Sequence, residues 1–93
     1  MSAVVCEIEL FIPGAASLKA KRHVVKSIIG RIKSRCNASA AETGYQDSWQ
    51  RSIITAAIAG AEHVILQKQI ELIRQIVYDN AEAELVDITT EYL

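Results

Sequence analysis

The fold is decided by residues 3–32, which read AVVCEIELFIPGAASLKAKRHVVKSIIGRI. The first ten of these residues alternate between two faces, and one face is purely apolar: Val4, Cys6, Ile8, Leu10 and Ile12. This period of two predicts a half-buried strand over residues 3–12, followed by a loop. From Leu18 the apolar residues recur at helical spacing, and Ser17 is a suitable N-cap because its hydroxyl can accept a free amide of the first turn. The change of period therefore predicts a helix over residues 17–36.

The rest of the chain adds two strands, a helix and a last strand. Residues 38–42 and 51–59 predict a hairpin with an irregular connection, residues 62–80 carry a broad apolar helical face, and residues 84–92 alternate again. The order strand, helix, strand, strand, helix, strand is the ferredoxin-like pattern. Right-handed crossovers then place both helices on one face of the sheet. The sequence thus predicts an α+β fold, βαββαβ in order, with a four-stranded antiparallel sheet.

Length and composition limit the class of protein. A chain of 93 residues with 51% hydrophobic residues predicts a single folded domain over residues 1–93. No apolar run approaches the roughly 20 residues needed to span a bilayer, so we expect no membrane contact. The N-terminus lacks the features of a signal peptide, which predicts a cytoplasmic protein. Cys6 and Cys36 lack a CxxC spacing and are interpreted as reduced thiols, with a disulfide between them as the alternative.

The net charge of −1 hides a strong polarisation of charge along the chain. Residues 10–41 hold seven of the ten Lys and Arg and no Asp or Glu, so this segment is +7 and the remainder is −8. On a helical wheel, four of these cations fall between about 40° and 100° from Leu18: Arg22, Lys33, Lys26 and Lys19. Cations in the first turns oppose the helix dipole, and free amides there bind anions. This pattern predicts an anion-binding or RNA-binding site made of Ser17, Lys19, Lys21, Arg22, Lys26 and Lys33. The alternative is a merely solvated helix face.

A polar cluster in the hairpin is a second candidate site. Together with Phe11 on the open face of the sheet, it predicts a partner-binding surface made of Glu42, Asp47, Trp49 and Arg51. Trp and Arg dominate the binding energy of many interfaces, which favours Trp49 as an anchor. The alternative is a structural cap, in which Trp49 covers the end of the sheet and Asp47 or Glu42 pairs with Arg51. Self-association through the open sheet face around Phe11 and Ile53 is also expected.

Five stretches resemble a known family. Residues 17–28 resemble its SLK-x-KR-x-VVKSI, residues 37–42 its N-V-S-V-A-E and residues 47–51 its D-x-W-Q-R, and residues 9–13 and 84–87 also fit. The chain thus resembles the YlxP family over nearly its whole length. The resemblance implies a small bacterial protein with a ferredoxin-like fold and no assigned biochemical function. The genes of this family often neighbour translation genes, which implies a ribosome or RNA setting.

No constellation in the sequence predicts catalysis, a metal site or a cofactor. Glu42 and Asp47 could form an acid–base pair, but no nucleophile is placed near His23 or His63. Acylphosphatase shares the βαββαβ order, but residues 13–18 do not match its Gly-rich first loop ending in Phe-Arg. The two Cys and two His have no metal-ligand spacing. We therefore expect a non-enzymatic domain.

Two functions of different class remain. The first is binding of structured RNA or a ribosomal surface through the first helix. An RNA-reading sheet is disfavoured, because it needs paired aromatics and the open face offers only Phe11, flanked by Glu7 and Glu9. The second is a protein–protein adaptor or homo-oligomer that uses the open sheet face with Trp49 as an anchor.

Overall fold

A computed structural model describes residues 2–93. The chain first forms strand β1 (Ser2–Phe11), helix α1 (Leu18–Arg35) and strand β2 (Ala38–Gly44). It then forms strand β3 (Arg51–Gly60), helix α2 (His63–Tyr78) and strand β4 (Glu84–Tyr92). The predicted βαββαβ order is confirmed, and most element ends lie within two residues of the predicted positions. The strands form one antiparallel sheet in the order β2-β3-β1-β4.

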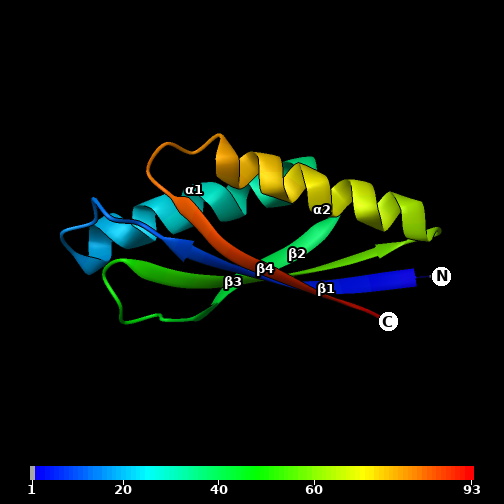
Figure 1. Ribbon diagram of the computed structural model, residues 1–93, viewed down its shortest axis with the longest axis horizontal. Helices are drawn as coiled ribbons and strands as arrows, with labels where there is room; N and C mark the ends of the chain where they lie inside the picture. Colours follow the sequence, from blue (N-terminus) through cyan, green and yellow to red (C-terminus); the bar gives the residue numbers. More distant parts are fainter. Residues whose placement is uncertain (1) are drawn as a thin grey trace.

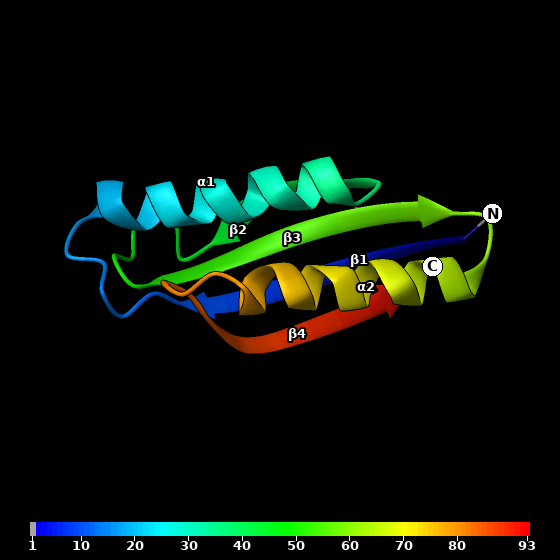
Figure 2. The same cartoon turned by 90° about the horizontal axis from the view of Figure 1, so that it is seen from above.

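Both helices cover the same face of this sheet, as predicted (Figure 1). Figure 2 shows α1 on the β2 side of the sheet and α2 on the β4 side. The core lies between the two layers, and its largest fully buried apolar side chains include Ile8, Leu10, Ile28, Ile54 and Ile73. The other face of the sheet has no covering element among residues 2–93.

Strand β4 departs from simple alternation. A register shift opposite Glu9 and Leu10 places an extra residue in β4, because Glu9 pairs with Asp87 and Leu10 pairs with Leu85. The residue between them, Val86, is 55% exposed, whereas Leu85 and Ile88 both pack against the core. A β-bulge of this kind lets two residues three positions apart share one face. The bulge also disrupts one free edge of the sheet, which protects it from pairing with other chains.

One half-buried amide and two buried thiols lie on the core side of the fold. Gln69, which is half-buried in α2, accepts a hydrogen bond from the backbone amide of Asn37 at 2.9 Å. Cys6 and Cys36 are buried free thiols. Burial raises the pKa of both thiols, so they stay protonated and unreactive in the folded protein. No helix within residues 2–93 combines the length and apolarity that a membrane crossing requires.

Candidate functional site

Helix α1 begins with the predicted side-chain cap. Ser17 has an extended backbone (φ −158°), and its Oγ accepts a hydrogen bond from the amide of Ala20 at 3.0 Å. The first turn that follows contains no acidic residue. The positive end of the helix dipole is therefore not offset by a carboxylate in that turn.

Four cations share one exposed flank of α1, and we call Lys19, Arg22, Lys26 and Lys33 the basic face. All four side chains are exposed. Three of them, with His23, line a shallow hollow of about 290 Å³. Within residues 2–93, none of the ion pairs involves a residue of the basic face. The charges of the basic face are therefore balanced only by solvent and salt.

The neighbours of α1 fix the direction of the basic face. Ala20 and Val24 line a small hollow together with Ala81 and Glu82 of the α2–β4 connection. That flank of α1 lies about 150° around the helix from the middle of the basic face. The basic face therefore points away from α2, on the side of the edge strand β2.

Lys21 does not belong to the exposed cations, and its predicted role in anion binding is wrong. Its side chain is 0% exposed, and Nζ lies 2.7 Å from Glu42 Oε2. Nζ also donates to the backbone oxygens of Tyr45 at 3.0 Å and Gln46 at 3.3 Å. The sequence already indicates that Lys21 is buried. On a helical wheel, Lys21 falls at about 300° from Leu18, in the middle of the apolar stripe that includes Ile28. No local pattern in the sequence identifies Glu42 as the partner of Lys21.

Glu42 is the second half of this buried pair, which corrects its predicted place in a partner-binding surface. Its side chain is only 15% exposed. The same Oε2 that binds Lys21 also accepts a hydrogen bond from Ser52 Oγ at 2.6 Å. Ser52 is itself 0% exposed, as expected from its alternation with buried Ile54 in β3. Lys21, Glu42 and Ser52 thus form a closed network in which every buried side-chain polar atom has a partner.

The connection between β2 and β3 is an ordered loop. Tyr45 is in the left-handed region with φ 54°, and its carbonyl accepts a hydrogen bond from Ser48 N at 3.0 Å. Ser48 Oγ in turn accepts from Arg51 N at 3.1 Å. Gln50 joins the loop to the segment before α1, because its Nε2 donates to Pro13 O at 3.0 Å. These bonds hold residues 45–51 against the start of α1.

The predicted surface residues of this loop fall into two groups. Asp47 is exposed and Trp49 is 57% exposed, so Trp49 does not serve as a buried cap on the sheet. Arg51 points back to the sheet, where Nη2 lies 2.6 Å from Glu9 Oε2, and this hydrogen bond raises the pKa of Arg51. The Arg51 guanidinium also lies 4.1 Å from the centre of the Tyr45 ring. The expectation that Asp47 or Glu42 pairs with Arg51 is therefore wrong, and the partner is Glu9.

The open face of the sheet is acidic. Phe11 and Ile53 are half-buried in it, as the strand periodicity predicts. Around them, five acids alternate with the core residues of β1 and β4: Glu7, Glu9, Glu84, Asp87 and Glu91. Only Arg51 on β3 carries the opposite charge next to them, as the partner of Glu9. The two faces of the protein therefore carry opposite charge.

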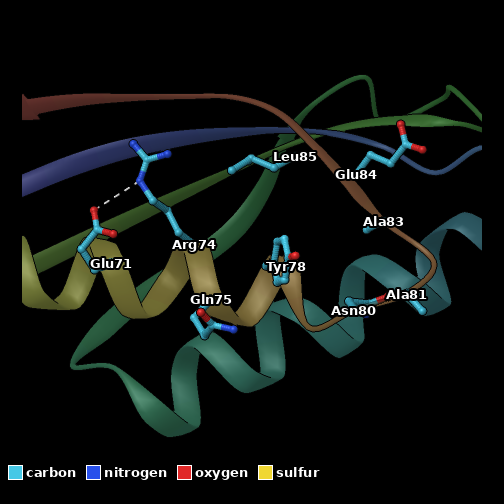
Figure 3. A pocket seen from close by; sticks show the side chains of 9 residues that line it. All are labelled: Glu71, Arg74, Gln75, Tyr78, Asn80, Ala81, Ala83, Glu84 and Leu85. Atoms are coloured by element: carbon cyan, nitrogen blue, oxygen red, sulfur yellow. Dashed lines mark ion pairs between the residues drawn. The ribbon is translucent and has the colours of Figure 1, made fainter.

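A further hollow of about 600 Å³ lies between α2 and β4. Figure 3 shows Arg74, Tyr78 and Leu85 directed toward this space. Its charges are mixed, since Arg74 forms a 3.4 Å ion pair with Glu71 and Glu84 lies on the opposite wall. The sequence did not predict this hollow, because its walls come from two elements whose approach is a tertiary feature. It offers no free cation to an anion.

His23 and His63 lie in different settings. His23 lies exposed among the cations of α1, and His63 stacks on Tyr92 with ring centres 4.4 Å apart. Across residues 2–93, no group of three or more His, Cys, Asp or Glu could hold a metal ion.

Comparison with known proteins places the chain in a family. The model of the family described as "Protein of unknown function (DUF503)" matches residues 3–90. The chain belongs to the DUF503 family. The chain is also similar to the uncharacterized protein YlxP of Bacillus subtilis (strain 168), with 35% identity over 86 residues, covering 92% of this chain and 94% of YlxP. The resemblance to the YlxP family is therefore confirmed.

Two solved structures show the same fold as this DUF503 chain. The de novo designed protein Foldit4 matches with a TM-score of 0.59 at 15% identity, covering 96% of both chains. The de novo designed protein LFR1 1 with ferredoxin fold matches with a TM-score of 0.53 at 18% identity, over 100% of this chain and 84% of that chain. These matches confirm the ferredoxin-like fold and carry no information on function.

The DUF503 chain joins its YlxP-like stretches by direct contacts. Lys21 in the first stretch pairs with Glu42 in the second. Gln50 in the third stretch donates to Pro13 at the end of the opening one. These motifs therefore build one structural unit, made of the start of α1 and the β2–β3 loop.

Proposed function

We propose that this protein binds structured RNA, free or on a ribosomal surface, through the basic face of α1. The observation that carries the proposal is the basic face itself: four exposed cations on one flank, with no counter-ion among residues 2–93. An exposed helix face usually has acidic and basic residues three or four positions apart, which pair with each other. The basic face has no such acids, so an external polyanion is its natural counter-ion.

The length of the basic face favours a polyanion over a single phosphate. Lys19 and Lys33 are fourteen residues apart, which is roughly 21 Å along a helix. Several backbone phosphates of a nucleic acid fit along this length, and each neutralised phosphate releases a condensed counter-ion. The loss of Lys21 from the predicted set leaves this row intact, because Lys21 lies on the core side of the helix.

The charges on the rest of the molecule favour an approach of RNA from the helix side. The acids of the open sheet face repel phosphate, and they lie on the far side of the sheet from α1. This arrangement orients an approaching RNA before contact, since charge asymmetry steers diffusional encounter. It also disfavours the RNA-binding mode in which bases stack on the open sheet.

Salt dependence tests the proposal. Fluorescence anisotropy of a labelled single-stranded RNA should give a plot of log affinity against log salt with a slope of about −3 for four phosphate contacts. A fourfold rise in salt then weakens binding roughly fiftyfold. Lys26→Gln should reduce the slope by about 0.7. Lys68→Gln, which changes another exposed lysine, on α2, is the matched control and should leave the slope unchanged.

Two results would contradict the proposal. The first is the absence of salt-sensitive binding to any member of a panel of hairpins and single strands. The second is equal loss of slope in Lys26→Gln and Lys68→Gln, which would mean that net charge acts without a defined face.

A basic protein partner on the open sheet face is the second candidate, and one observation favours it. The face combines half-buried Phe11 and Ile53 with a surrounding set of acids. An apolar centre with a charged rim is typical of protein interfaces. Stacking of two identical copies through this face would oppose like charges, so the charge pattern favours a basic partner over the sheet-to-sheet homo-oligomer.

A further inference from the structure

Trp49 is the only tryptophan of the chain, and the fold presents it to solvent. Its side chain is 57% exposed at the tip of the β2–β3 loop. A large aromatic surface left in water is a typical feature of a binding anchor, because its burial by a partner releases free energy. The Trp49 side chain belongs neither to the hydrophobic core nor to the basic face.

Hydrogen bonds hold the backbone of the loop on both sides of Trp49. The preceding residue, Ser48, donates its amide to Tyr45 O, and its Oγ accepts from the amides of Gln50 and Arg51. Below the loop, the buried Nζ of Lys21 holds the carbonyls of Tyr45 and Gln46. A rigid aromatic loses little conformational freedom on binding, which makes it an effective contact.

The same end of the molecule carries the first cations of the basic face. Both ribbon views place the β2–β3 loop beside the β1–α1 connection (Figures 1 and 2). Gln50 confirms the contact, because Nε2 donates to Pro13 O and Ala15 O just before α1. The loop that carries Trp49 therefore lies at the end of α1 where the row of cations begins with Lys19.

A second aromatic surface lies in the same loop. Tyr45 is 42% exposed, and the Arg51 guanidinium covers one face of its ring at 4.1 Å. Arg51 is anchored by Glu9, yet its side chain remains 48% exposed. Planar guanidinium groups and aromatic rings both stack on nucleobases.

We propose that Trp49 is a stacking platform for an unpaired nucleobase of the RNA whose phosphates lie on the basic face. This inference rests on the proposed function and specifies its ligand class: RNA with unpaired bases next to the phosphates bound by α1, such as a hairpin loop or a single strand.

The intrinsic fluorescence of Trp49 tests the inference, because no other tryptophan contributes to the signal. The wild-type protein is titrated with a single-stranded RNA, a blunt RNA duplex and inorganic polyphosphate, at equal phosphate concentration. Single-stranded RNA should quench the emission on binding. Polyphosphate should compete for the basic face without quenching, since it has no base to stack, and the duplex should quench little because its bases are already paired.

Variants supply an independent readout by anisotropy of labelled RNA. Trp49→Ala should weaken binding of single-stranded RNA roughly five- to 150-fold, the range measured for loss of one aromatic–base stack, with an unchanged salt slope. Trp49→Phe should retain most of the affinity. Tyr78→Ala removes another exposed aromatic, on α2 (84% exposed), and should have no effect.

The outcomes separate this inference from the proposed function. Salt-sensitive RNA binding without quenching, and with equal affinity in Trp49→Ala, would overturn the stacking platform and leave RNA binding by α1 standing. Quenching by polyphosphate equal to that by RNA would also overturn it. If neither RNA nor polyphosphate binds, the proposed function fails and the stacking platform fails with it.

Discussion

Lys21 is a buried ammonium group held by three oxygen atoms. Glu42 Oε2, Tyr45 O and Gln46 O surround Nζ at 2.7–3.3 Å. A buried ion pair is weak support for stability, because the desolvation of two charges offsets their attraction. Removal of one partner is different, since it leaves the other charge buried and unpaired. The pair therefore acts mainly by selecting one arrangement of the β2–β3 loop under the start of α1.

A substitution in this pair should have a large effect. Glu42→Ala should lower the free energy of unfolding by roughly 3–5 kcal/mol, because Lys21 and the buried hydroxyl of Ser52 lose their shared acceptor. The double variant Lys21→Met/Glu42→Leu should recover part of this loss, since it leaves no charge buried and unpaired, while the Ser52 hydroxyl still lacks its acceptor. Urea denaturation measures both values.

Glu71→Ala is the matched control for this prediction. It breaks the exposed ion pair with Arg74, and exposed pairs contribute little, so its effect should be much smaller. Equal effects of Glu42→Ala and Glu71→Ala would show that the Lys21–Glu42 pair has no special role in stability.

Strand β2 ends in a bulge that requires a glycine. The β2–β3 register shifts between Glu42 and Gly44, and Gly44 pairs with Ile53. A Cβ on Gly44 would lie 2.8 Å from Ile53 Cδ1 and 3.0 Å from Ile53 Cβ. The second distance involves an atom fixed to the backbone, so rotation of the Ile53 side chain cannot remove the clash. The bulge sets where the strand stops and the Trp49 loop begins.

Two glycine substitutions should therefore have opposite signs. Gly44→Ala should destabilise the protein by roughly 1–3 kcal/mol through overpacking against Ile53. Gly30→Ala should stabilise it by about 1 kcal/mol, because Gly30 lies inside α1 and a Cβ there meets no atom within 4 Å. Thermal unfolding of the two variants measures the difference, and a stabilised Gly44→Ala protein would contradict the close approach.

Helix α1 combines two unrelated faces in one element. Val25, Ile28 and Ile32 face the sheet, while the basic face is turned to solvent. Its packing against the sheet makes the positions of the cations rigid at the backbone level, although their side chains remain free. A rigid scaffold with flexible cationic ends suits binding to phosphates of variable geometry.

At the scale of the whole molecule, charge is separated between two layers. The helix layer carries the basic face, and the sheet layer carries the acids around Phe11 and Ile53. Such a separation predicts that the two faces can be altered independently. It also separates the two candidate functions, because RNA and a basic protein would bind opposite sides.

Charge reversal on the sheet tests this separation. In Glu7→Lys/Asp87→Lys, the affinity for RNA should stay the same or rise at low salt, because a distant repulsion is removed while the contacts at α1 persist. Binding of a lysine-rich protein partner at the sheet face should be lost. Anisotropy with labelled RNA and a pull-down with that partner measure the two effects. A fall in RNA affinity would contradict the assignment of RNA to the helix side.

Local periodicity predicts much of this structure. The alternation of Val4, Cys6 and Ile8 and the helical spacing of Val25 and Ile28 define which side of each element meets the core. The right-handed crossover rule then leaves one arrangement of helices and sheet. Ser17 as the N-cap and the exposure of the basic face follow from the same local patterns.

Local periodicity does not predict the partners of the charged groups. Glu42 is 21 residues from Lys21, and Glu9 is 42 residues from Arg51. No period within a strand or helix encodes such a distance, because it depends on strand register, on two bulges and on the crossover of the chain. Wheel geometry alone could have placed Lys21 in the core, but only its carbonyl and carboxylate acceptors explain why a cation is stable there.

The sequence by itself determined the order of the elements, their buried faces and the row of cations on α1. Only the tertiary structure decided that Lys21 pairs with Glu42, that Arg51 pairs with Glu9, and that Trp49 stands exposed in a loop bonded to the segment before α1. The physical reason is the range of the interactions. The burial of an apolar face is a property of each element alone, whereas ion pairs and loop positions depend on which elements meet.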